Sequence, residues 1–132
     1  MRAPRGSTSR LATLHAAIGF AIVGGFALLA LWGLGTWIVR RGPGRAFWWL
    51  VAALQVVLIL QLAAGLVLLA MGRSRGLLHY LYGVAFPALV LLGAHWLARE
   101  ALPERPWAPF AVAGFICFGL TLRALTTGLG IG

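Results

Sequence analysis

Two histidines stand at equivalent positions in a repeated eight-residue pattern. Residues 14–21 read L-H-A-A-I-G-F-A, and residues 78–85 read L-H-Y-L-Y-G-V-A, 64 positions later. Both copies follow Leu-His-x-x-x-Gly-x-Ala and lie near the start of a long apolar stretch. Because imidazole nitrogens bind transition metals well, His15 and His79 are candidate ligands of a metal-bearing cofactor if the fold brings them together.

The composition predicts the elements that carry these histidines. Hydrophobic residues make up 61% of the 132-residue chain and charged residues only 10%, which is too apolar for an ordinary soluble domain. The apolar residues form four blocks, each about as long as the ~20 residues of a membrane-spanning helix. We therefore expect an all-α integral membrane protein, with helices at about 11–39, 46–71, 77–98 and 107–127.

The first ten residues are polar and basic and precede the first apolar block. That block is longer than the apolar region of a signal peptide, and no small-x-small cleavage site precedes a soluble domain. We interpret residues 1–10 as a basic N-terminal tail and residues 11–128 as the four-helix transmembrane domain.

The segments that connect the expected helices are short, which favours antiparallel neighbours in an up-down-up-down bundle. Both termini and the loop after the second helix then lie on one side of the membrane, called the near side below. The other two loops lie on the opposite, far side. The repeated pattern makes the first and third helices equivalent and suggests two repeated hairpins, with chance similarity as the alternative explanation.

The formal charge of +9 comes from arginine alone. The arginines cluster at helix ends rather than along one face, which disfavours nucleic-acid binding and indicates charge that flanks a membrane. Near-side arginines are Arg2, Arg5, Arg10, Arg73 and Arg75, with Arg123 close by; far-side arginines are Arg40, Arg41, Arg45, Arg99 and Arg105. This distribution favours a multi-pass protein of the cell membrane with cytoplasmic N- and C-termini.

All the tryptophans fall at far-side helix ends, as an interfacial aromatic belt requires. They are Trp32, Trp37, Trp48, Trp49, Trp96 and Trp107. The alternative is that several of them pack against a partner protein.

Polar side chains converge at one depth near the near side. His15 and His79 each lie about four residues inside a helix, or roughly 6 Å below its end, and Arg123 reaches the same depth from the fourth helix. Ionisable groups inside a membrane usually face the bundle interior or a cavity. The other polar residues of this zone are Gln61, Tyr80, Tyr82, Thr121 and Thr126.

This convergence favours a b-type haem between the first and third helices, with His15 and His79 as its axial ligands. Gly19 and Gly83 follow the histidines by four residues on nearly the same helix face, where they would let a flat macrocycle approach the backbone. Arg123 would pair with a haem propionate. Tyr82 completes the candidate cofactor-binding residues.

The same residues have simpler interpretations. The histidines could bond to lipid headgroups or to backbone, and the glycines could serve close helix packing. Arg123 could extend to the near-side headgroups. A quinone or another polar ligand could occupy the zone in place of haem.

The remaining histidine, cysteine and glutamate residues do not indicate a catalytic site. His95 lies 16 residues after His79, turned roughly 160° away on the helix, and is interpreted as a far-side interface residue. The single Cys117 cannot form a disulfide within the chain. Glu100 and Glu104 stand among loop arginines and resemble solvated charges, so no catalytic residue is expected and the chain is not expected to be an enzyme by itself.

With His15 and His79 on the first and third of four helices, the chain resembles small four-helix membrane cytochromes b, the b561-like group in the broad sense. The resemblance implies a haem-b electron carrier or cytochrome subunit. Members of that group often carry a second histidine pair, and His95 has no partner histidine here, so one haem near the near side is implied.

Two other functions stay open from the sequence. One is a non-catalytic accessory subunit of a larger respiratory or photosynthetic membrane complex. The other is a membrane protein that binds a quinone or a lipid. In each case the expected partners are the lipid bilayer and other membrane subunits or further copies of the chain.

Overall fold

The computed structural model describes residues 5–72, 74 and 76–130, and these residues contain helices and no strand. The elements are α1 (Arg5–Val39), α2 (Arg45–Ala70), α3 (Leu77–Tyr80), the π-helical η1 (Leu81–Ala85), α4 (Phe86–Trp96), the π-helical η2 (Leu97–Ala101) and α5 (Trp107–Leu129). The segments α3, η1, α4 and η2 follow one another without a break and form the third long helix. The expected all-α fold with four long helices is confirmed. Arg2, Arg73 and Arg75 lie outside the described residues.

Four helices are long and apolar enough to cross a membrane, with mean hydropathies between 1.7 and 2.4. Their outward faces carry large apolar side chains, such as Leu31, Ile59 and Phe115, which are 65–70% exposed. Such continuous apolar surface is stable in lipid and not in water. These features support the expected multi-pass protein in a lipid bilayer.

Two helices extend beyond their apolar blocks. Helix α1 begins at Arg5 rather than Leu11, and the third helix continues to Ala101 rather than ending at 98. Hydropathy marks the segment that prefers lipid, whereas backbone hydrogen bonding can continue past the membrane boundary. At its other end α1 stops where Arg40 adopts a left-handed φ of 60°.

The π-helical segment η1 ends at Ala85, two residues before Pro87. A proline has no backbone N–H, and its ring collides with the carbonyl group four residues earlier, which here belongs to Gly83. The wider π-helical turn replaces the four-residue hydrogen-bond spacing of an α-helix with a five-residue one. The backbone N–H of Phe86 donates to the carbonyl oxygen of Leu81, five residues back. A proline inside a helix commonly kinks it, and here the distortion takes the form of a π-helical turn.

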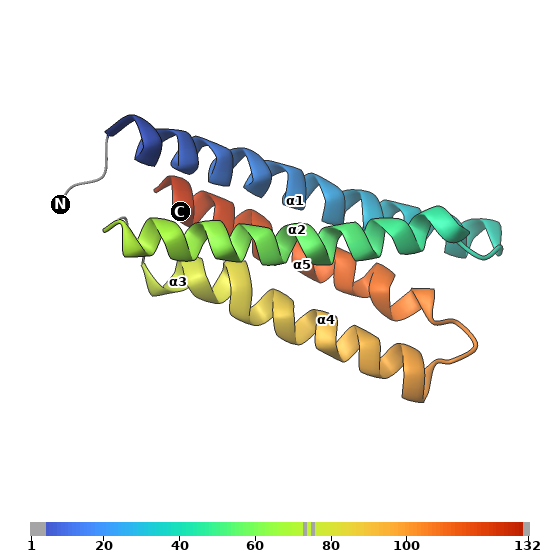
Figure 1. Ribbon diagram of the computed structural model, residues 1–132. Helices are drawn as coiled ribbons and strands as arrows, with labels where there is room; N and C mark the ends of the chain where they lie inside the picture. The colour runs from blue at the N-terminus through green and yellow to red at the C-terminus, as the bar shows by residue number, and fades with distance from the viewer. Residues whose placement is uncertain (1–4, 73, 75, 131–132) are drawn as a thin grey trace.

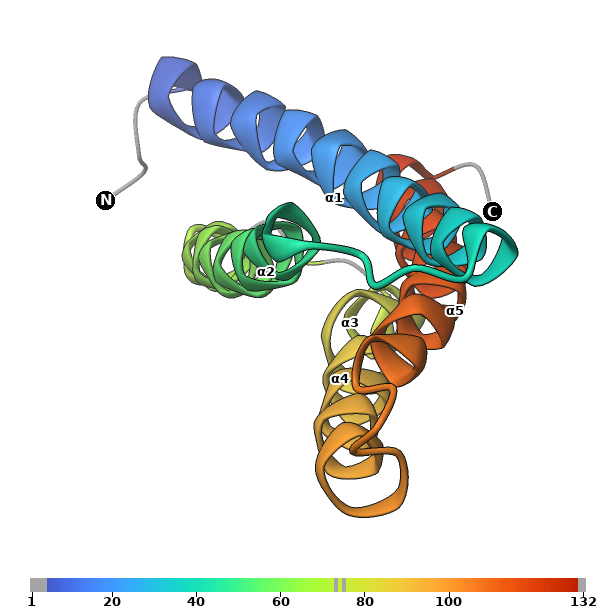
Figure 2. The same ribbon diagram turned by 90° about the vertical axis from the view of Figure 1, so that its right-hand side faces the viewer.

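Helix α1 makes its most extensive contacts with α5, and its next with α2. The third helix packs on α5, while α2 packs chiefly on α1. Figure 1 shows the loops 40–44 and 102–106 at one end of the molecule and the chain termini at the other. Figure 2, viewed from the loop end, shows the first turns of α2 standing apart from α4.

The buried core occupies the far half of the molecule. It is built around Phe26 and Leu29 of α1, Phe47 of α2, and Phe110 and Cys117 of α5, each no more than 3% exposed. The near half of the same helices holds no comparable cluster of buried apolar residues among the described residues. The helices there enclose a cavity instead.

Candidate cofactor site

A cavity of about 400 Å³ lies between the near-side halves of the helices. Its walls come from all four long helices, with His15 and Gly19 on α1, Gln61 on α2, and His79 on α3 among them. The lining residues, all within the described part of the chain, include no Arg, Lys, Asp or Glu. The volume falls within the roughly 300–1,000 Å³ of small-molecule sites.

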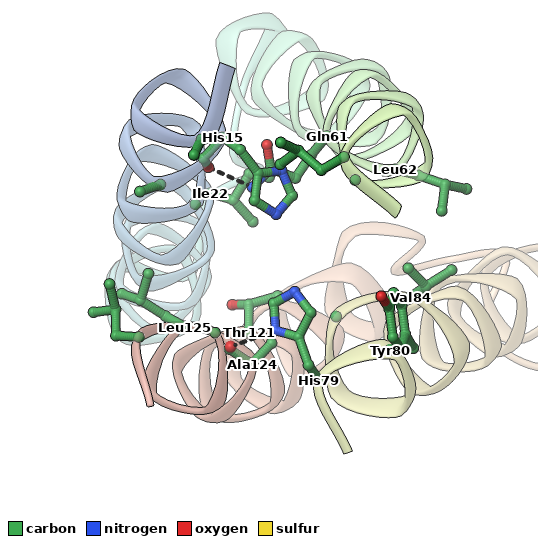
Figure 3. A pocket seen from close by; sticks show the side chains of 18 of the residues that line it. His15, Ile22, Gln61, Leu62, His79, Tyr80, Val84, Thr121, Ala124 and Leu125 are labelled. Carbon is green, nitrogen blue, oxygen red and sulfur yellow. Dashed lines mark hydrogen bonds between the residues drawn. The ribbon is translucent and has the colours of Figure 1, made fainter. Parts of the chain in front are cut away.

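His15 and His79 face one another across this cavity. Figure 3 shows the two rings pointing toward each other, one from α1 and the other from α3. The ring centroids are 6.1 Å apart, with an angle of 64° between the ring planes. Both residues are half-buried. The structure thus brings together the two histidines that the repeated pattern singled out.

A hydrogen bond to α5 fixes the ring of His79. Its Nδ1 lies 2.9 Å from the carbonyl oxygen of Ala124, which can only accept, so Nδ1 carries the proton. The neutral ring then has its lone pair on Nε2. This arrangement, with one ring N–H on a backbone carbonyl, is the usual support of a metal-binding histidine.

Glycines of the two remaining helices lie against the imidazole rings. A Cβ atom on Gly65 of α2 would lie 3.4 Å from Cε1 of His15. A Cβ atom on Gly128 of α5 would lie only 2.8 Å from Cε1 and 3.1 Å from Nδ1 of His79. The absence of a side chain at Gly128 is therefore necessary for the observed position of His79.

Gln61 ties α2 to the backbone of α1 beside the first histidine. Its Nε2 donates to the carbonyl oxygen of His15 at 2.6 Å. This bond orients the amide, because a flipped amide would bring two oxygens together. The Oε1 atom of Gln61 is buried and, among the described residues, has no hydrogen-bond partner. It is an acceptor available to a ligand of the cavity that it lines.

The glycines of the repeated pattern also line the cavity. A Cβ atom on Gly19 would touch the side chains of Gln61 and Leu125 at 3.4 Å, and one on Gly83 would touch the Cβ of Ala124 at 3.5 Å. These are ordinary van der Waals or slightly tight contacts. Gly19 and Gly83 thus lie in the cavity wall, and their role toward a macrocycle stays a prediction, while Gly65 and Gly128 lie against the histidine rings.

Two other predicted residues lie elsewhere. Arg123 is exposed, and among the described residues neither Arg123 nor Tyr82 lines the cavity. Tyr82 packs instead on Phe86, with ring centroids 5.6 Å apart. Tyr80 takes the place in the lining that the sequence assigned to Tyr82, and its ring lies 5.6 Å from that of His79.

The arrangement suits a ligand that needs two opposed nitrogen donors. In the part of the chain that the structure describes, no group of three or more His, Cys, Asp or Glu side chains could hold a metal ion. A cofactor that brings its own equatorial ligands needs only two axial side chains.

The chain was compared with protein-family models, with curated proteins and with solved structures, and none of them matches it. The functional argument therefore depends on the residues of the cavity.

Proposed function

We propose that the chain is a small membrane electron carrier or cytochrome subunit that binds one b-type haem through His15 and His79. The observation that supports this most strongly is the 6.1 Å separation of the opposed imidazole rings. Two imidazoles on opposite sides of one metal ion, with metal–nitrogen bonds of roughly 2.0–2.1 Å plus a ring radius on each side, have centroids about 6.4 Å apart. The observed spacing is close to the one at which His15 and His79 would hold a metal-bearing group between them.

The chemistry of the donors fits haem iron. The His79 ring has its proton on Nδ1 through the carbonyl of Ala124, which leaves Nε2 as the ligand atom. Two neutral imidazoles are the axial set of many low-spin electron-transfer haems, and bound haem would supply reversible one-electron transfer. The protein's part is to orient the two rings and to exclude water from the site.

The cavity is small for a macrocycle, so side chains must move on binding. Leu62, Leu66 and Leu125 line it, and leucines change rotamer at low cost. The cavity wall formed by α2 can move outward most easily, because α2 packs chiefly on α1. Ser9 and Thr13 line the cavity, and their hydroxyl groups would be available to the carboxylates of the haem. Pairing of the exposed Arg123 with a propionate stays a prediction.

We further propose that the four helices cross the cell membrane in up-down-up-down order with both termini on the cytoplasmic side. The grouping of the loops 40–44 and 102–106 at one end in Figure 1 supports the order. The positive-inside rule supports the orientation. Further membrane subunits or copies of the chain are proposed as partners, with the exposed Trp37, Trp49 and Trp96 at the far side as belt residues or contacts.

Absorption spectroscopy of the full chain tests the haem proposal. The protein is purified from a membrane in detergent, with and without added haemin, and a reduced-minus-oxidised spectrum is recorded. We expect a Soret band and a sharp α-band with about one haem per chain. If no haem absorption appears even after reconstitution, the haem proposal is wrong.

A substitution at Gly128 tests the geometry separately from the ligands. In Gly128→Val the new side chain would overlap the His79 ring, since even its Cβ would lie 2.8 Å from Cε1. We expect a displaced ring, a broadened or high-spin spectrum, and at least tenfold weaker haem retention. The matched control is Gly119→Val, because a Cβ on Gly119 meets nothing within 4 Å. Equal spectra for the two variants would contradict the assignment of His79 as a ligand in this position.

A further inference from the structure

A second cleft lies at the far side, beyond the buried core. It has a volume of about 430 Å³ and opens between α2 and the third helix, with Pro106 and Phe110 behind it. His95, which the haem proposal leaves unused, is one of its lining residues. Because 16 residues separate His95 from His79, about 24 Å of helix divides this cleft from the near-side cavity.

Hydrogen bonds fix the proton position on His95 and the orientation of the Gln55 amide in this cleft. Nε2 of His95 donates to Oε1 of Gln55 at 2.8 Å, across the gap between α4 and α2. The amide of Gln55 is itself oriented, because its Nε2 donates to the carbonyl oxygen of Val51 at 3.2 Å. A neutral His95 ring is thereby left with Nδ1 as an acceptor. The guanidinium of Arg99 also lines the cleft and offers further hydrogen-bond donors; it is largely exposed, and its Nε lies 3.7 Å from Oε1 of Glu100.

Aromatic rings form the wall of the cleft. Phe110 is 3% exposed, and its ring centroid lies 4.8 Å from that of His95 and 5.5 Å from that of Trp48. Ala52 and Ala98 keep the space beside these rings open. The π-helical segment η2 carries both Ala98 and Arg99, and such segments frequently occur at functional sites.

From these features we infer that the far-side cleft binds the head group of a membrane quinone. A quinone ring is flat and apolar and can pack on the aromatic wall. Its carbonyl oxygens accept from Arg99, and the hydroxyl of its reduced form can donate to Nδ1 of His95. Its isoprenoid tail leaves through the open side between α2 and α4 into lipid. This inference is independent of the haem proposal.

The test titrates decylubiquinone into the full chain, which is held in nanodiscs of a neutral phospholipid. Binding is measured as quenching of tryptophan fluorescence. We expect saturable binding that weakens at least tenfold in His95→Ala. A second variant, Ala98→Leu, fills the cleft and keeps the His95–Gln55 hydrogen bond, so it remains informative if loss of His95 impairs folding. The control is Gly119→Val, because Gly119 lines neither cavity and a Cβ there meets nothing within 4 Å; this variant should bind normally.

Three outcomes would overturn the inference. The first is the absence of saturable quenching in the wild type. The second is equal affinity in the wild type and in both His95→Ala and Ala98→Leu, or a matching loss in Gly119→Val, which would show that quinone binding does not depend on the far-side cleft. The third is displacement of decylubiquinone by phosphatidylglycerol but not by neutral phospholipid, which would identify the cleft as an anionic lipid site.

Discussion

In the haem-loaded protein, His79→Ala is expected to abolish the sharp α-band and the low-spin Soret band. Without one imidazole the cavity would no longer hold the haem from both sides, because His15 and His79 are the two histidines that line it among the described residues. His15→Ala should have the same effect, since each ring supplies one of the two opposed donors. The measurement is the reduced-minus-oxidised spectrum together with the haem-to-protein ratio after size-exclusion chromatography.

Two controls separate ligand loss from misfolding. His95→Ala removes a histidine from the far-side cleft and should leave the haem spectrum intact. Free imidazole added to His79→Ala should restore a low-spin spectrum by entering the vacated space. Retention of a wild-type spectrum by His79→Ala or His15→Ala would show that haem, if bound, uses other ligands.

The second large effect concerns the crossing of α1 and α5. A Cβ atom on Gly33 would overlap the Cβ of Ala111 and would lie 3.2 Å from its Cα. The backbone of α5 cannot yield as a side chain would, so Gly33→Ala must push the two helices apart. We expect a loss of about 1–3 kcal/mol in the free energy of unfolding, typical of overpacking, seen as a lower midpoint of thermal unfolding by circular dichroism.

Gly35→Ala is the matched control for that substitution. A Cβ on Gly35 meets nothing within 4 Å, so this variant carries only the gain in helix propensity of roughly 1 kcal/mol. The difference between the two variants isolates the steric effect. Equal midpoints for Gly33→Ala and Gly35→Ala would mean that α1 and α5 do not cross closely at Gly33.

Much of the fold could be predicted from composition, because lipid demands apolar helices of a fixed minimum length. The break at residues 40–44 is marked by glycine, proline and charge, and the break at 102–106 by proline and charge. The start of α1 at Arg5 and the end of the third helix at Ala101 were not predictable in this way. Helices continue into water on backbone hydrogen bonds, which leave no hydropathy signal.

The two histidines could be found from their spacing, but the groups that hold them could not. Gly65, Gly128 and the carbonyl of Ala124 contact the imidazole rings from α2 and α5. Nothing in the local sequence marks these residues, because their role depends on how distant helices pack. The bond from Gln61 to the carbonyl of His15 is likewise a long-range contact.

The positions of Arg123 and Tyr82 outside the cavity lining have a different cause, which is rotation about the helix axis. Thr121, Ala124 and Gly128 of α5 line the cavity and follow the spacing of one helix face, which turns Arg123 outward. That stripe of small residues was a signal in the sequence. On the third helix His79, Tyr80 and Gly83 line the cavity, and at 100° per residue Tyr82 falls outside the sector that they span.

The dominance of the α1–α5 contact has a consequence for biosynthesis. The first of the four helices to be made pairs most extensively with the last. A nascent chain of which only the first three helices have left the ribosome would expose the face of α1 that α5 later covers. In that chain the His79 ring would lack its hydrogen-bond acceptor, the carbonyl oxygen of Ala124. Final assembly of the bundle, and capture of any cofactor between the histidines, must therefore await insertion of the fourth helix.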